Sequence, residues 1–102
     1  MRIFLLGYMG TGKTYWGKLW ATRNDMDFFD LDQEIERNTG MTIREIFEKH
    51  GESFFREKEK EALHQFENKE EFILSTGGGT PCFFDNMQWM NNKGITIYLN
   101  TS

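Results

Sequence analysis

Short apolar runs alternate with longer stretches of helix-forming residues along the whole chain. The runs at 2–6, 27–30, 72–75 and 95–99 have the length of buried strands; a glycine follows the first directly, and glycines follow the third after one threonine. The segments between the runs are mostly long enough to form helices. This order predicts an α/β fold with a mostly parallel sheet, helices on both faces, and ligands at the carboxyl ends of the strands.

Helix signals occupy the first two intervening segments. Good helix formers fill 13–23, and a second helix is expected from the end of the second strand to Gly40. Thr42, with Glu45 three residues later, forms a capping-box pattern that predicts the start of another helix. That helix should end at Gly51, because glycine commonly terminates helices.

Two further helices are expected in the second half. One should run from Ser53 to about residue 67, because apolar residues recur there with helical spacing, and another should follow Pro81. The first of these carries Phe55, Ala62, Leu63 and Phe66 on one face, and the second contains Phe84, Met87, Trp89 and Met90.

Composition and charge restrict the class of protein. A chain of 102 residues with 38% hydrophobic residues can form one modest core, so residues 1–102 are expected to be a single domain. The net charge of -4 argues against nucleic acid as the main partner. The single cysteine, Cys82, is expected to be a small buried residue, and its isolation argues against an internal disulfide or a zinc site. Glycines and Lys13 interrupt the first apolar run well before membrane-spanning length, which predicts no membrane insertion and a cytoplasmic location.

A phosphate-binding loop is the strongest motif. The pattern G-x-x-x-x-G-K-[ST] is matched without a mismatch, between a predicted strand and a predicted helix, by Gly7-Tyr8-Met9-Gly10-Thr11-Gly12-Lys13-Thr14. Backbone N–H groups and the helix N-terminus would hold the phosphates, Lys13 would reach the β and γ phosphates, and Thr14 would ligate Mg²⁺. The nucleotide contacts are expected from Gly10, Thr11, Gly12, Lys13, Thr14 and Tyr15. The alternative is a glycine-rich turn with a solvated lysine.

Carboxylates and an arginine supply candidate acceptor chemistry. Asp30 and Asp32 close the second strand, where one could serve a metal ion and the other an acceptor hydroxyl. Alternatively, Asp32 is a helix N-cap and Asp30 a solvated strand end. Glu59 falls on the apolar face of its predicted helix, one turn after Arg56, and a guanidinium paired there could grip a ligand carboxylate. The alternative is an ordinary surface ion pair.

Three consecutive glycines, Gly77 to Gly79, follow the third strand. They cost chain entropy that a simple turn does not require, so something is expected to come close to this backbone; the alternative is a loose connection. A GTPase would carry D-x-x-G here and N-K-x-D later, whereas Thr76 precedes the glycines and the Asn92-Lys93 pair precedes Gly94. A small-molecule kinase is therefore favoured over a guanine-nucleotide switch.

Together these motifs resemble the shikimate kinases. The phosphate loop, Asp-x-Asp, the Gly-Glu-x-x-Phe-Arg stretch at 51–56 and the triple glycine occur in the order and spacing of that family. The resemblance implies a three-layer P-loop kinase fold and ATP-dependent phosphorylation of the 3-hydroxyl of shikimate, in chorismate biosynthesis.

The resemblance also implies roles for particular residues. Lys13 and Asp32 would be catalytic, with Asp32 orienting or deprotonating the shikimate hydroxyl. Arg56 would bind the carboxylate, and Asp30 would belong with Thr14 to the Mg²⁺ shell. The backbone of Gly77, Gly78 and Gly79 would hold the ring.

Members of the family continue beyond the last strand seen here into a lid, a further strand and a helix. We therefore expect this chain to bind ATP and perhaps shikimate but to turn over poorly. Its last strand would be an uncovered apolar edge, so we expect either self-association or, as the favoured alternative, a natural chain that continues beyond Ser102. Alternatives are another small-metabolite kinase, such as a gluconate kinase, and a non-catalytic nucleotide-binding fragment.

Overall fold

One parallel sheet forms the centre of the computed structural model, which describes residues 1–7, 12–77 and 79–98. Its strands are β1 (Arg2–Leu6), β2 (Asp27–Asp30), β3 (Phe72–Ser75) and β4 (Ile95–Tyr98). They lie in the order β2-β3-β1-β4, and each neighbouring pair is parallel. Ser75 is level with both Leu5 and Asp30, so the carboxyl ends of β1, β2 and β3 meet at one edge.

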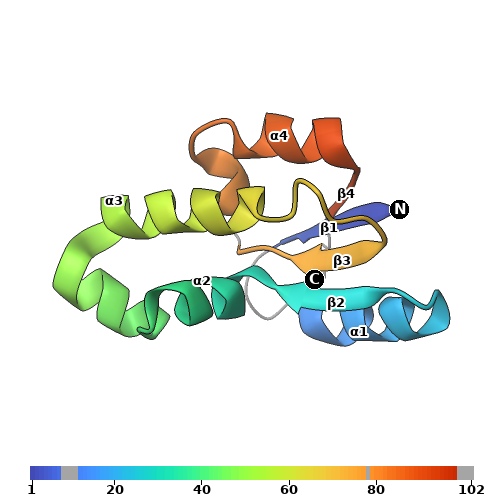
Figure 1. Cartoon of the computed structure of the whole chain (residues 1–102), viewed down its shortest axis with the longest axis horizontal. Helices are drawn as coiled ribbons and strands as arrows, with labels where there is room; N and C mark the ends of the chain where they lie inside the picture. Colours follow the sequence, from blue (N-terminus) through green and yellow to red (C-terminus); the bar gives the residue numbers. More distant parts are fainter. Residues whose placement is uncertain (8–11, 78, 99–102) are drawn as a thin grey trace.

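Helices cover both faces of the sheet, as predicted (Figure 1). The helical elements are α1 (Lys13–Arg23), α2 (Leu31–Thr39), α3 (Ile43–His64), the 3₁₀ turn η1 (Thr80–Cys82) and α4 (Asn86–Lys93). Helix α1 lies below the sheet in this view, whereas α4 and the second half of α3 lie above it. The predicted three-layer α/β architecture is confirmed.

Alternation along the strands divides the core into two parts. Phe4 and Leu74 belong to the larger apolar cluster, which packs against α2, α3 and α4. Their strand neighbours Leu5 and Ile73 belong to the smaller cluster under α1, together with Ala21. Both central strands are buried on both faces, which explains why their sequences are continuously apolar. None of the helices that the structure describes is long and apolar enough to cross a membrane.

The start of α2 differs from the expected capping. Asp30, not Asp32, is the N-cap, and its carboxylate accepts a hydrogen bond from the Asp32 N–H at 2.9 Å. The expectation that Asp32 could be the cap was wrong because the helix begins directly at Leu31. Gly40 ends α2 in the left-handed region, with φ of 70°, as its position predicted.

Helix α3 joins the two helices that were expected on either side of Gly51. The predicted capping box is present, with Thr42 and Glu45 each accepting a backbone hydrogen bond from the other. Gly51 has non-helical backbone angles, with φ of 85° and ψ of 179°, so the first helical half of α3 ends there and the second continues after a sharp kink, as the glycine predicted. The bend lets Phe47 and Phe55 approach each other, with ring centroids 4.8 Å apart.

The segment after the triple glycine also differs from prediction. Pro81 lies within the short turn η1, which begins at Thr80. Phe84 has φ of 52° and lies outside any helix, so α4 begins later, at Asn86. The expectation that Cys82 is buried was wrong, because its side chain is exposed on this turn. Helix α3 ends at His64, a turn before the expected end.

Candidate functional site

A cavity of about 500 Å³ lies where the carboxyl ends of β1, β2 and β3 meet. Its walls come from the start of α1, the β2–α2 junction, both halves of α3 and the turn after β3. The lining residues are Gly12, Lys13, Thr14, Asp30, Asp32, Phe47, Phe55, Arg56, Glu59, Thr76, Gly77 and Gly79. Residues that are distant in sequence and were predicted as site residues are therefore brought together in one cavity.

The phosphate-loop side of the cavity carries Lys13. Its Nζ donates a hydrogen bond to the Gly7 carbonyl at 2.5 Å. Burial lowers the pKa of Lys13, and the nearby carboxylates of Asp30 and Asp32 counteract that decrease. Gly12 precedes α1 with φ of 82°, a conformation that favours glycine.

Of the other residues predicted to contact the nucleotide, some line the cavity and others do not. Thr14 lines the cavity beside Lys13. Tyr15 is 66% exposed, does not line the cavity, and packs its ring edge against Trp16. Gly10 and Thr11 lie outside the described residues.

Asp32, which lines the same cavity as Lys13, has a raised pKa. The pKa of Asp32 is raised to about 6, chiefly by burial and then by the carboxylates of Asp30, Glu59 and Glu36, whereas Lys13 opposes the increase. A carboxylate with a pKa close to neutrality can accept a proton from a hydroxyl and still be ionised at pH 7. Asp32 is thus suited to general base chemistry.

Arg56 is held by a buried carboxylate. Its Nη1 donates to Glu59 Oε1 at 3.0 Å, and the Glu59 side chain is only 1% exposed. The alternative of an ordinary surface pair was wrong, because the helix face that carries Glu59 packs against the core. A second carboxylate, Glu52, lies 3.7 Å from Nη2 with a 60% exposed side chain, which is a loose contact that a ligand carboxylate could replace.

The glycine turn lies against this arginine. A Cβ atom added at Gly79 would lie 2.8 Å from Arg56 Nη2, so only glycine allows the guanidinium to come this close. The expectation that a group approaches this backbone is confirmed for Gly79. At Gly77 the nearest atom to such a Cβ would be 3.5 Å away, which is an ordinary contact, and Gly78 lies outside the described residues.

Sequence reasoning did not assign site roles to Phe47, Phe55 and Thr76. The two rings form an apolar wall that exists only because α3 bends at Gly51, so the glycine inside an otherwise helical pattern was the available signal. Thr76 donates to the Leu5 carbonyl through both its N–H and its hydroxyl, at 3.0 and 3.1 Å. These bonds join the ends of β1 and β3 beneath the cavity.

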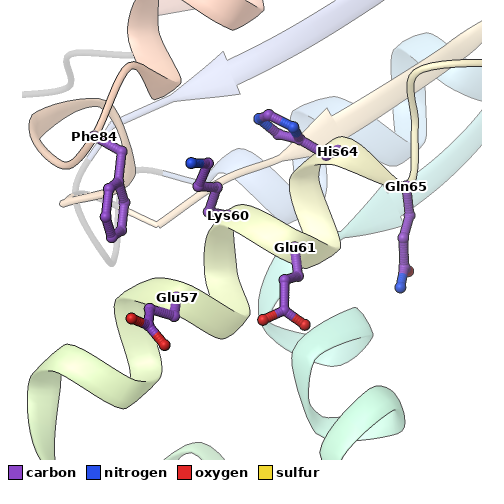
Figure 2. Close-up of a pocket in the computed structure, with 6 residues that line it drawn as sticks. All are labelled: Glu57, Lys60, Glu61, His64, Gln65 and Phe84. Carbon is purple, nitrogen blue, oxygen red and sulfur yellow. The ribbon is translucent and has the colours of Figure 1, made fainter.

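A second hollow of about 540 Å³ lies elsewhere on α3 and shares no lining residue with this site. Figure 2 shows Glu57, Lys60, Glu61 and His64 projecting from α3, with Gln65 directly after the helix and Phe84 on the neighbouring turn. His64 stacks on Trp89 at 4.7 Å, and partial burial lowers its pKa, as does the charge of Lys60. Within the described ranges no group of three or more His, Cys, Asp or Glu side chains could hold a metal ion.

The parallel sheet, with its cavity at the carboxyl edge and a lysine-bearing helix start after β1, defines a P-loop kinase fold. Known proteins of this fold match closely. The family model described as shikimate kinase matches residues 9–102. A shikimate kinase of Phocaeicola vulgatus is 50% identical over 99 residues, which cover 97% of this chain and 57% of that protein.

Solved structures agree. The crystal structure of shikimate kinase from Bacteroides thetaiotaomicron is 49% identical, with a TM-score of 0.94 over 98% of this chain and 57% of that one. A shikimate kinase from Acinetobacter baumannii in complex with shikimate is 42% identical, with a TM-score of 0.95 over 99% of this chain and 56% of that one. The chain belongs to the shikimate kinase family, and it spans somewhat more than half the length of these relatives.

Proposed function

We propose that this chain carries the phosphate and acceptor sites of a kinase that transfers the γ-phosphoryl group of ATP to a hydroxyl of shikimate. The observation that carries the proposal is the Arg56 guanidinium, fixed against buried Glu59 on the wall of a cavity that also contains Lys13 and Asp32. A bidentate donor suits a carboxylate, and shikimate has both a carboxylate and ring hydroxyls. The Acinetobacter baumannii relative was solved with shikimate.

We assign a separate role in the reaction to each group of residues that lines the cavity. Lys13 balances phosphate charge, Arg56 holds the ligand carboxylate, and the backbone at Gly77 and Gly79 borders the ring. Asp32 takes the hydroxyl proton as the hydroxyl oxygen bonds to the γ-phosphorus. The bond from that phosphorus to the bridging oxygen breaks, and ADP leaves.

A magnesium ion fits the oxygen ligands available beside Lys13. Thr14 and Asp30 contribute a hydroxyl and a carboxylate to the cavity wall, and Mg²⁺ characteristically takes few protein oxygens together with water and phosphate oxygens. Bound there, it would neutralise charge on the triphosphate. The hydrogen bond that the Asp30 carboxylate accepts from the Asp32 N–H, at the start of α2, fixes the orientation of this candidate magnesium ligand.

Two other properties belong to the proposal. A cytoplasmic location follows from the use of ATP.

Self-association follows from the exposed side chains of β4, an edge strand of the described sheet, where Ile95 and Tyr98 are 49% and 54% exposed. Size-exclusion chromatography across a concentration series should show a dimer, and a monomer at every concentration would contradict self-association.

Calorimetric titration of the chain with Mg-ATP, shikimate and gluconate tests the function. We expect ATP and shikimate to bind and gluconate to bind at least about tenfold more weakly than shikimate, since the proposed site fits a carboxylate on a ring. Lys13→Ala should weaken ATP at least about tenfold and leave shikimate nearly unchanged. Preference for gluconate would indicate a different metabolite kinase, and binding of ATP alone would indicate a nucleotide-binding module.

A further inference from the structure

We infer that Thr80 and Phe83, on the turn between β3 and α4, are positioning residues that fix the guanidinium of Arg56 before any ligand binds. The inference rests on the proposed function for its consequence, which is affinity for a carboxylate ligand. Its structural content concerns only Arg56 and the groups that surround it. Neither Thr80 nor Phe83 lines the cavity, so both act through other side chains.

Thr80 acts through Glu59. Its Oγ1 donates to Glu59 Oε2 at 2.7 Å, while the same carboxylate accepts from Arg56 Nη1 at 3.0 Å on Oε1. Thr80 is fully buried and Glu59 almost so, with exposed fractions of 0% and 1%. A buried carboxylate needs donors on both oxygens, and one that keeps only Arg56 loses part of the restraint on its own rotation. The hydroxyl therefore sets the orientation of the group that orients the guanidinium.

Phe83 acts on the guanidinium directly. Its ring centroid lies 4.1 Å from Arg56 Cζ, closer than the Phe55 ring at 5.0 Å. A guanidinium at this distance from an aromatic face gains a cation–π attraction, and rotation of its plane would disrupt that contact. Gly79 approaches the same group, so the turn contacts Arg56 through backbone and ring together.

The turn that carries these residues is itself anchored. Asn86, the first residue of α4, is fully buried, and its Nδ2 donates to the Thr80 carbonyl at 3.0 Å. The Cys82 N–H donates to the Gly79 carbonyl at 3.0 Å. A connected set of contacts thus leads from α4 through Thr80 and Glu59 to Arg56, whose Nε is buried without a hydrogen-bond partner among the described residues.

A pre-positioned arginine binds a carboxylate more tightly, because the ordering of its long side chain does not have to occur on binding. Loss of the Thr80 hydroxyl should therefore weaken shikimate binding about tenfold, since it leaves Oε2 of buried Glu59 with only its longer contact to Arg56 Nη1, at 3.3 Å. ATP affinity should change less than about twofold, because the phosphates bind on the other wall.

The experiment compares four variants of the chain. Thr80→Val removes the hydroxyl at nearly constant volume, and Thr80→Ser restores it. Phe83→Leu removes the aromatic face, and Phe84→Leu is the matched control, because the neighbouring ring is 55% exposed in the second hollow and contacts Lys60 (Figure 2). Each variant is titrated calorimetrically with shikimate and with Mg-ATP. Nitrogen NMR of the Arg56 side chain, recorded without ligand, reports whether rotation of the guanidinium is hindered.

We expect hindered rotation and full shikimate affinity in the original chain, in Thr80→Ser and in Phe84→Leu, and freer rotation with weaker shikimate binding in Thr80→Val and Phe83→Leu. Unchanged rotation in both of the last two variants would overturn the inference. The inference would also be overturned if Thr80→Ser did not restore shikimate affinity. An equal loss of ATP and shikimate affinity would overturn it as well, because it would indicate a structural role. If the original chain does not bind shikimate but the NMR pattern holds, positioning stands and the proposed function fails.

Discussion

Replacement of Asp32 by asparagine should stabilise the fold while removing the proposed base. Asp32 lies in the cavity wall, where burial and then the nearby carboxylates of Asp30, Glu59 and Glu36 raise its pKa to about 6 from an ordinary value of 3.8. A raised pKa means that the folded chain prefers the protonated form. The ionised form is therefore a cost to stability, which asparagine does not carry.

The sign and the pH range follow from the two pKa values. The cost is complete above pH 6, falls as the pH decreases from 6 to 3.8, and is absent below 3.8. A difference of about 2 pH units corresponds to about 3 kcal/mol at most, at about 1.4 kcal/mol per pH unit. Asp32 is partly exposed, and solvent screens its neighbours, so a gain of about 1–2 kcal/mol is a better expectation. In a domain of this size each kcal/mol corresponds to roughly 4–8 °C in Tm.

Thermal unfolding followed by circular dichroism at pH 8 and pH 4 measures this gain. The Asp32→Asn variant should melt well above the original chain at pH 8, and the two should melt close together at pH 4. Asp27→Asn is the control, because Asp27 is an exposed carboxylate at the opposite end of β2 and should not change Tm with this pH dependence. Equal Tm values for Asp32→Asn and the original chain at pH 8 would refute the reasoning, and so would a gain that persists at pH 4.

Two other substitutions test parts of the same account. Asp30→Asn keeps an N-cap side chain for α2 but removes the charge beside Asp32, so the pKa of Asp32, followed by carbon NMR of its carboxyl group, should fall; an unchanged value would exclude Asp30 as a cause. Gly17→Ala places a Cβ about 2.2 Å from the ring of Phe28 in the cluster under α1, and should cost about 1–3 kcal/mol in urea unfolding. Full stability of that variant would mean that α1 packs less closely on β2.

Much of the fold could be predicted because local and tertiary preferences agree. The apolar run of β1 stops at Gly7, the capping box at Thr42 begins α3, and Gly40 ends α2, and each signal depends on a few adjacent residues. The pairing of Arg56 with Glu59 was also accessible, since residues three apart meet on a helix surface. Their burial was not: the sequence left an ordinary surface ion pair open, and the packing of this face of α3 against the core decided between the two.

Other features depend on contacts between distant residues. The identity of the α2 cap depended on a shift of two residues that no propensity distinguishes, because Asp30 and Asp32 are equally good caps. The delayed start of α4 reflects the bond from Asn86 to Thr80 and the bond from Thr80 to Glu59, which lies 21 residues earlier. Such a network becomes visible only when the turn and α3 are placed side by side.

The most direct test of the central claim compares shikimate with its methyl ester on the original chain and on Arg56→Lys. The ester keeps the ring and hydroxyls but lacks the charged carboxylate, and lysine keeps the charge of Arg56 but lacks the bidentate fork. Calorimetry should show that the original chain binds shikimate at least about tenfold more tightly than the ester, and that Arg56→Lys loses most of this discrimination. The same discrimination in both proteins, or equal affinity of the original chain for acid and ester, would contradict the assignment of this cavity as a shikimate site gripped by Arg56.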